Sequence, residues 1–171
     1  MKPRDYSELA LPGVRRLKPY TPGKPIAELE REYGVTDSIK LASNENPLGA
    51  SPRSLAALRG ELEDIWLYPD ANGFELKQAL ADRHGVPPEC ITLGNGSNDV
   101  LVFLAQAFLR PGVEAVFSQY CFAVYPIACS MVGASSKAVP ALPEGDPMAM
   151  GHDLRGLYQA VGPETRMVFV A

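Results

Sequence analysis

Two short apolar runs that flank a helical stretch constrain the fold of this chain more than any other feature. Ile91–Leu93 and Ala115–Phe117 each have the length of a strand, and between them a glycine turn opens a helical stretch that ends near Leu109. This order predicts a βαβ unit with parallel strands. The alternation continues with a helix, a strand and a second helix over 125–132, 136–139 and 154–161. The sequence therefore predicts an α/β sandwich built on a mainly parallel sheet.

The last residues, Met167–Ala171, form a continuous apolar run that is typical of a central strand buried on both faces. The loop and helix that should cover such a strand do not follow it. We therefore expect the 171 residues to be a fragment of a longer protein.

Proline and glycine dominate the segment Pro12–Pro25, which predicts an extended arm rather than a packed element. After the arm, cap and periodicity signals predict helices. These helices are expected over 25–33, 51–64 and 72–83. Ile39–Ala42 has the composition of a brief strand, and Pro140–Gly151 that of a surface loop.

Composition excludes several classes of protein. The chain is 46% hydrophobic and 21% charged, as is typical of globular proteins, and its formal net charge of −4 comes without the basic cluster that nucleic-acid binding needs. The first residues lack the apolar core of a secretory signal, and no run approaches the about eighteen apolar residues of a membrane span. We expect a cytoplasmic protein with no membrane contact. The odd cysteine count and the absence of CxxC spacing argue against a disulfide framework or zinc site and favour buried cysteines at 90, 121 and 129.

The segment Gly94–Asp99 follows a predicted strand and opens a predicted helix. Exposed backbone N–H groups at a helix start form a site for phosphate, and Ser97 and Asn98 add further donors. A capped helix after a tight turn explains the same residues equally well. A dinucleotide site is a weaker alternative, because Asp99 replaces the third glycine and no acid stands about twenty residues further on.

Other polar and aromatic segments are candidates for ligand contact. The loop at 118–125 follows the next strand, so the ring of Phe122 could stack on a planar cofactor, although Phe122 and Tyr125 also suit a core. Asn44, Asn46 and Tyr68 are candidates for ligand contact as well. Asn44 and Asn46 suit the closing of turns equally well, and Tyr68 suits simple packing equally well.

Taken together, these segments resemble the pyridoxal-phosphate-dependent class-II aminotransferases of fold type I, and most closely the histidinol-phosphate aminotransferase family. The resemblance rests on four segments and covers almost the whole chain. These are the arm at 14–25, the SNENPLG motif at 43–49, the tyrosine-proline loop at 68–70 and the turn at 96–99. The resemblance implies a three-layer α/β/α large domain with an N-terminal arm. Residues 1–50 would form the arm and the start of a small domain, and residues 51–171 an incomplete large domain.

The resemblance also implies roles for individual residues. Gly96, Ser97 and Asn98 would bind the phosphate of pyridoxal 5'-phosphate, and Phe122 would stack on its ring. Tyr68 would reach the cofactor phosphate of the neighbouring subunit in a homodimer. On the substrate side would lie Tyr20, Asn44 and Asn46. The implied reaction converts L-histidinol phosphate and 2-oxoglutarate to imidazole-acetol phosphate and L-glutamate, a step of histidine biosynthesis.

The family's catalytic lysine has no counterpart among the lysines of this chain, none of which stands in a Ser-Lys context after a strand. The resemblance places it beyond Ala171, so we expect no catalytic residue in this chain and no activity from the chain alone. Alternatives are another fold-type I enzyme, either an aromatic aminotransferase or a threonine-phosphate decarboxylase, or a non-catalytic truncated product.

Overall fold

The structure is a computed structural model that describes residues 6–18, 23–41 and 43–171. The chain divides into two compact units. One consists of Met1–Pro19 together with Thr92–Ala171, and the other of Tyr20–Ile91. Each unit is described by itself.

The first unit contains a parallel sheet of three strands. These are β1 (Glu114–Ser118), β2 (Ser135–Val139) and β3 (Thr165–Phe169), in the order β2-β1-β3. Phe117 of β1 lies opposite Ala138 on one side and Phe169 on the other. The parallel sheet predicted from the sequence is confirmed.

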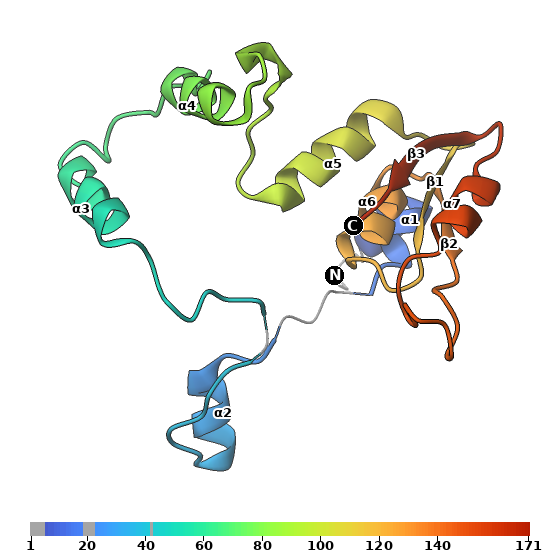
Figure 1. Ribbon diagram of the computed structural model, residues 1–171, viewed down its shortest axis with the longest axis horizontal. Coiled ribbons are helices and arrows are strands. Elements are labelled where there is room, and N and C mark those ends of the chain that lie inside the picture. Colours follow the sequence, from blue (N-terminus) through green and yellow to red (C-terminus); the bar gives the residue numbers. More distant parts are fainter. Residues whose placement is uncertain (1–5, 19–22, 42) are drawn as a thin grey trace, which may run out of the picture. The chain divides into compact units, whose positions relative to one another are not determined.

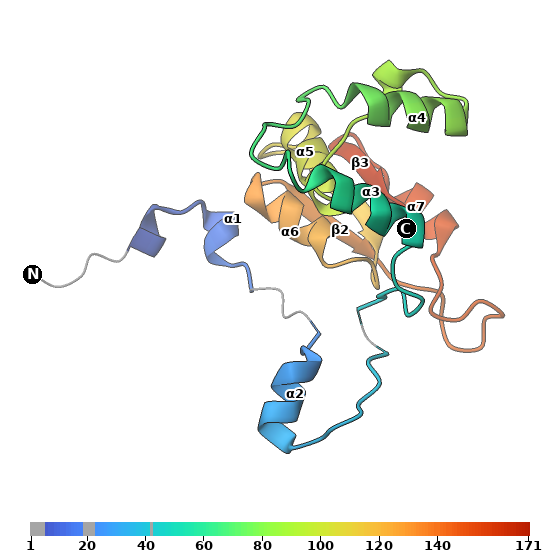
Figure 2. The same ribbon diagram turned by 90° about the vertical axis from the view of Figure 1, so that its left-hand side faces the viewer.

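Helices cover both faces of this sheet. Figures 1 and 2 show α5 (Ser97–Phe108) and α6 (Val124–Met131) on one face and α7 (Leu154–Ala160) on the other. The face toward α5 and α6 holds the larger core, which consists of Ala105, Leu109, Val113, Ala115, Phe117, Ala128, Cys129 and Phe169. The face toward α7 holds Val116, Val139 and Leu157. The three-layer α/β/α arrangement is therefore confirmed.

The central strand of the sheet is β1, not the last strand. Ala115 and Val116 are fully buried, because β1 pairs on both sides and is covered on both faces. The predicted central strand at the end of the chain is β3, which pairs with β1 alone among the described residues. Val168 and Val170 are accordingly 41% and 64% exposed. Among the described residues β3 is therefore an edge strand, and its burial on both faces in a longer protein stays a prediction.

The second unit is helical. It contains α2 (Ile26–Tyr33), α3 (Pro52–Glu61), α4 (Phe74–His84) and the short 3-10 helix η2 (Pro88–Cys90). All three predicted helices are confirmed, with ends shifted by a few residues. The ends of α2 and α4 are the most closely predicted, since each is followed by a left-handed glycine, Gly34 and Gly85.

Two predicted strands are absent from the described residues. Ile39–Leu41 and Ile91–Leu93 are neither helix nor strand, and Ala42 lies outside the described part of the chain. Both segments have apolar side chains, but a strand exists only where a neighbour accepts its backbone hydrogen bonds. The described sheet consists of β1, β2 and β3, so neither segment has such a neighbour.

The N-terminal arm is more ordered than expected. Tyr6–Leu9 forms the 3-10 helix η1, and Pro12–Arg15 forms the short helix α1, which contacts α6. The prediction of an extended segment was wrong here, because Pro12 at a first helical position favours the helix that it would interrupt elsewhere. Gly13 lies so close to the carbonyl oxygen of Ser130 that a Cβ atom there would collide with it.

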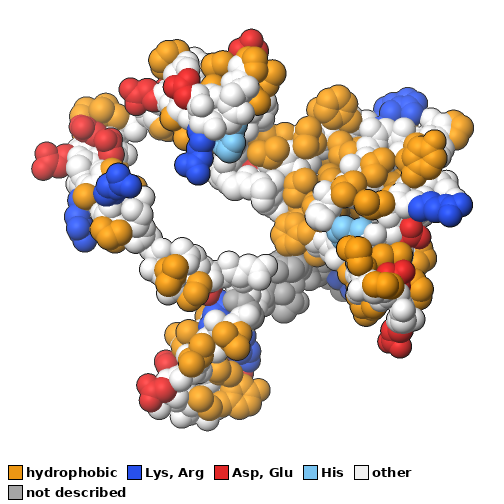
Figure 3. All heavy atoms as spheres, in the orientation of Figure 1, with side chains coloured by type: hydrophobic (Ala, Val, Ile, Leu, Met, Phe, Trp, Pro, Cys, Tyr) orange, Lys and Arg blue, Asp and Glu red, His pale blue; other side chains and the backbone are white. Residues whose placement is uncertain are grey.

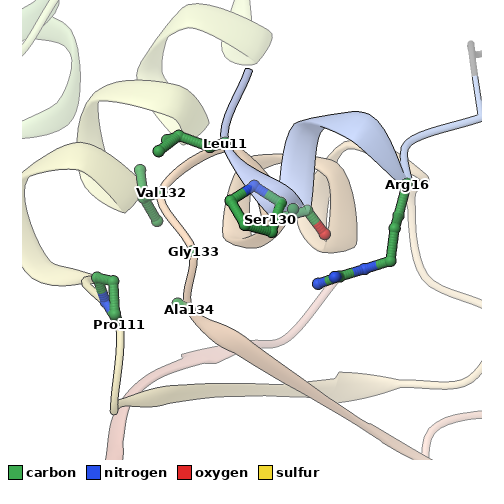
Figure 4. A pocket seen from close by; sticks show the side chains of 9 residues that line it. Leu11, Arg16, Pro111, Ser130, Val132, Gly133 and Ala134 are labelled. Atoms are coloured by element: carbon green, nitrogen blue, oxygen red, sulfur yellow. The ribbon is translucent and has the colours of Figure 1, made fainter. Parts of the chain in front are cut away.

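A pocket of about 280 Å³ opens beside this contact (Figure 4). The apolar part of its lining includes Pro12, Pro111 and Val132, and the Arg16 side chain extends across it toward Ser130. Among the described residues, none of those predicted to bind cofactor or substrate lines this pocket.

The cysteines differ in their burial. Cys129 is fully buried and Cys121 partly buried, but Cys90 is exposed at the end of η2, so the prediction of buried cysteines was wrong for Cys90. Among the described residues, no group of histidine, cysteine and acidic side chains is arranged to hold a metal ion. Within the same residues, no helix combines the length and the apolar character required to cross a membrane.

Candidate functional site

The turn before α5 has a geometry that needs its glycines. Gly96 has a φ of 78°, in the left-handed region that favours glycine, and its N–H donates to the carbonyl of Gly94 at 2.8 Å. A Cβ at Gly94 would lie 2.9 Å from the Cβ of Asp99. The carboxylate of Asp99 accepts the N–H of Asn95 at 3.0 Å and so closes the turn onto the first turn of the helix. The backbone here is therefore held in one conformation.

The start of α5 leaves backbone donors free. N–H groups in the first turn of an α-helix have no acceptor within the helix, and Gly96 supplies no side-chain cap. Ser97 and Asn98, the first two helical residues, are exposed. Their N–H groups, the Ser97 hydroxyl and the Asn98 amide are donors available to an anion, and the helix dipole favours negative charge at this end.

The loop that follows β1 is anchored at several points. The N–H of Gln119 donates to the carbonyl of Val139 at 2.7 Å, and its side-chain Oε1 accepts the N–H of Ala141 at 3.3 Å. The N–H of Cys121 donates to the carbonyl of Ser118 at 3.1 Å. These bonds hold the backbone just before Phe122, whose side chain remains 47% exposed.

Topology brings this loop and the glycine turn to the same edge of the sheet. A short connection joins the end of α5 to the start of β1, so the helix runs antiparallel to the strand, and its face at Leu101, Ala105 and Leu109 packs on the larger core. The N-terminus of α5 therefore points toward the carboxyl ends of the strands, on the side where β3 also ends (Figure 1). Ligands of parallel α/β folds bind at this edge.

The buried groups near this edge are polar or weakly reactive. Ser118, at the carboxyl end of β1, is 3% exposed, and its Oγ atom has no hydrogen-bond partner among the described residues. Burial raises the pKa of the Cys121 thiol and also that of Cys129. Both thiols are therefore protonated at neutral pH, and neither is suited to act as a nucleophile.

The remaining predicted site residues belong to the second unit. Asn46 stabilises a turn, because its side chain accepts the N–H of Leu48 at 3.0 Å and donates to the carbonyl of Gly49 at 3.0 Å. Asn44 has a left-handed backbone with a φ of 51°. The Tyr68 side chain is fully exposed. The turn-closing alternative considered for Asn46 thus has direct support.

Asp70 shapes the loop after Tyr68. Its two carboxylate oxygens accept the N–H groups of Phe74 at 2.7 Å and Asn72 at 2.9 Å, which leads the chain into α4. These bonds, with that from Phe74 contributing most, hold the pKa of the Asp70 carboxyl below its usual range. Asp70 was not among the predicted site residues, although an aspartate just ahead of a helix is a sequence signal for side-chain bonds to the free N–H groups at a helix start.

The predicted site residues thus fall into separate groups. Gly96, Ser97, Asn98 and Phe122 share one edge of the sheet in the first unit. Asn44, Asn46 and Tyr68 form no part of that unit, and Tyr20 lies outside the described residues.

The edge of the first unit fits a ligand with a phosphate and a flat ring. Fixed backbone donors and neighbouring hydroxyl and amide groups suit the phosphate, and the exposed face of Phe122 suits the ring. The negative charge of the Asp99 carboxylate opposes the binding of a phosphate at this turn. One of its oxygens, however, accepts a hydrogen bond from the N–H of Asn95 across the turn.

Comparisons with solved structures give the fold its class. Histidinol-phosphate aminotransferase from Sinorhizobium meliloti, solved in complex with pyridoxal-5'-phosphate, matches with a TM-score of 0.74 and 29% identity, covering 90% of this chain and 39% of that chain. N-succinyldiaminopimelate aminotransferase from Mycobacterium tuberculosis matches with a TM-score of 0.60 and 28% identity, covering 69% of this chain and 33% of that one. The parallel sheet with its flanking helices is the fold of the pyridoxal-phosphate-dependent transferases of fold type I.

Curated relatives narrow the resemblance within this class. Histidinol-phosphate aminotransferase 2 of Pseudomonas aeruginosa is 54% identical over 169 residues, which are 98% of this chain and 44% of the relative. That of Methylococcus capsulatus is 56% identical over 163 residues, 95% of this chain and 44% of the relative. The resemblance to histidinol-phosphate aminotransferases is therefore confirmed. The chain spans less than half the length of these relatives, and no family model matches it.

Proposed function

We propose that this chain forms the cofactor-holding part of a histidinol-phosphate aminotransferase. The whole protein would convert L-histidinol phosphate and 2-oxoglutarate to imidazole-acetol phosphate and L-glutamate, with pyridoxal 5'-phosphate as cofactor. The observation that carries this proposal is the rigid glycine turn, which presents the free N–H groups of Ser97 and Asn98 at the ligand-binding edge of the sheet. The names of the relatives support a transaminase and do not favour the decarboxylase or the non-catalytic alternative.

Each residue of the first unit has a defined task in this proposal. Ser97 and Asn98 hold the cofactor phosphate, and Gly96 lets the backbone approach it closely. Phe122 stacks on the ring and orients it. When bound, the pyridoxal ring supplies an electron sink for the electron pair at the substrate's amino-bearing carbon.

Other tasks depend on the second unit and on a partner subunit. We propose that Tyr68 contacts the cofactor phosphate of the other subunit in a homodimer, and that Tyr20, Asn44 and Asn46 line the substrate side. The lysine that carries the cofactor would come from the part of the relatives that this chain does not span. The 171-residue chain alone would then have no catalytic residue and no transaminase activity.

We further propose the domain division that the resemblance implies. Residues 1–50 would contribute the arm and the start of a small domain, and residues 51–171 part of the large domain. A cytoplasmic location stays a prediction.

The test is an assay of the protein encoded by the full reading frame, with pyridoxal phosphate added. We expect glutamate to form from L-histidinol phosphate and 2-oxoglutarate, with 2-oxoglutarate as the amino acceptor. In a parallel assay with threonine phosphate in place of these substrates, release of carbon dioxide would indicate the decarboxylase instead, and a protein that binds no cofactor would overturn the proposal.

A charge substitution tests the phosphate site directly. Ser97→Asp places a carboxylate at the start of α5 and should weaken binding of pyridoxal phosphate at least about tenfold by charge repulsion. Ser54→Asp is the matched control, because Ser54 is also an exposed serine in the first turn of a helix, α3. Equal affinity in the two variants would exclude the turn as the phosphate site.

A further inference from the structure

Tyr125 lies at the centre of a group of four aromatic rings. Its ring is stacked on that of Phe169, with centroids 4.4 Å apart and planes inclined by 9°. It lies perpendicular to the ring of Phe122, at 6.3 Å and 88°, and tilted against Phe117, at 6.4 Å and 52°. Tyr125 therefore connects the exposed ring of Phe122 to two rings of the buried core.

Tyr125 is itself held in place. It is part of α6, whose first residue is Val124, and its N–H donates to the carbonyl of Phe122 at 3.1 Å. Phe169, on which it stacks, is 8% exposed and ends β3, next to Phe117 of β1. The position of the Tyr125 ring is thus set by the sheet as well as by its own helix.

We propose that Tyr125 is a positioning residue for Phe122, which fixes the orientation of that ring before the cofactor binds. This inference rests on the proposed function, in which Phe122 stacks on the pyridoxal ring. A half-exposed aromatic side chain would otherwise lose rotamer freedom on binding, and a ring that is already fixed loses less. Perpendicular aromatic pairs are themselves favourable.

The test compares cofactor affinity in a double-mutant cycle on the protein encoded by the full reading frame. Tyr125→Leu should weaken pyridoxal phosphate binding about tenfold and change the visible circular dichroism of the bound cofactor, because that signal depends on ring orientation. In a Phe122→Leu background the same substitution should change affinity less than twofold. Tyr125→Met, which keeps apolar volume, serves in its place if Tyr125→Leu does not fold. The control is Tyr158→Leu, since Tyr158 is 82% exposed on α7.

The outcomes separate the two proposals. Equal losses of affinity with and without the Phe122 ring would assign Tyr125 a general structural role and overturn the inference. Unchanged affinity and dichroism in Tyr125→Leu would overturn it as well, while cofactor binding by the unsubstituted protein would leave the proposed function standing. A protein that binds no pyridoxal phosphate would overturn both proposals.

Discussion

At the residue scale, the glycine turn depends on one carboxylate. Asp99 accepts the N–H of Asn95 and lies against Gly94, so its removal frees the segment that presents the phosphate donors. We expect Asp99→Ala to lower the free energy of unfolding by about 1 kcal/mol, as the loss of a helix-start hydrogen bond does. Chemical denaturation measures this change.

The matched control for this substitution is Asp99→Asn. The asparagine oxygen can still accept the N–H of Asn95, so most of the stability should return although the charge is lost. Equal stability of Asp99→Ala and the unsubstituted chain would show that the turn does not depend on this side chain.

A second carboxylate makes stability depend on pH. The pKa of Asp70 is lowered in the folded state by the N–H groups of Phe74 and Asn72, whereas in the unfolded chain it returns to about 3.9. Its contribution is therefore fully present above the unfolded pKa and is lost as the pH falls through the lower, folded value. We expect the helical circular dichroism of the chain to fall in this acidic range. The Asp70→Asn variant should lack this component of the pH profile, and identical profiles would contradict the assignment.

At the element scale, α7 packs on β2 through a glycine. A Cβ at Gly156 would lie 2.6 Å from Oδ2 of Asp153 and 2.9 Å from Cγ1 of Val139. Asp153 also caps the helix by accepting the N–H of Gly156 at 2.8 Å. Gly156→Ala should therefore destabilise the first unit by about 1–3 kcal/mol, as overpacking does.

The same denaturation experiment includes a control glycine. Gly162 has no atom within 4 Å of the position of an added Cβ, so Gly162→Ala should leave the unfolding midpoint nearly unchanged or raise it slightly. If both substitutions lowered the midpoint equally, the loss would reflect glycine flexibility rather than the contact between α7 and β2.

At the scale of the whole molecule, the two units carry different thiol reporters. Cys90 is exposed in the helical unit, and Cys129 is fully buried in the sheet-containing unit, where burial raises its pKa. A thiol reagent should modify Cys90 at least about a hundredfold faster than Cys129, because Cys129 reacts only when its unit opens. Mass spectrometry of the labelled peptides measures both rates. Labelling of Cys129 as fast as Cys90 in native buffer would contradict the burial, and denatured protein supplies the reference in which the rates converge.

The unit that contains the sheet exposes a considerable apolar surface. Figure 3 shows hydrophobic side chains on the face of this unit that is in view. Phe108 on α5 is 60% exposed and Val170 beyond β3 is 64% exposed. This surface is compatible with a chain that spans less than half the length of its relatives.

Local signals in the sequence predicted the helices well. Gly34 and Gly85 end their helices in a left-handed backbone conformation that few other residues adopt easily. The position of each glycine in the sequence therefore predicts where its helix ends. The glycine turn before α5 was predicted for a similar reason. The same residues led to the candidate phosphate site, because a turn between apolar and helical segments has a fixed place in a parallel α/β fold.

Pairing and packing could not be derived from local signals. Ile91–Leu93 resembles a strand as closely as Ala115–Phe117 does, yet only the second has neighbours on both sides, and β3 lies at the edge of the described sheet. The sequence by itself therefore determined where the longer helices and the glycine turn lie, because their hydrogen bonds join residues near one another in the chain. The tertiary structure decided which apolar runs became strands and that the ring of Phe169 stacks on Tyr125, because those contacts join residues far apart in the chain.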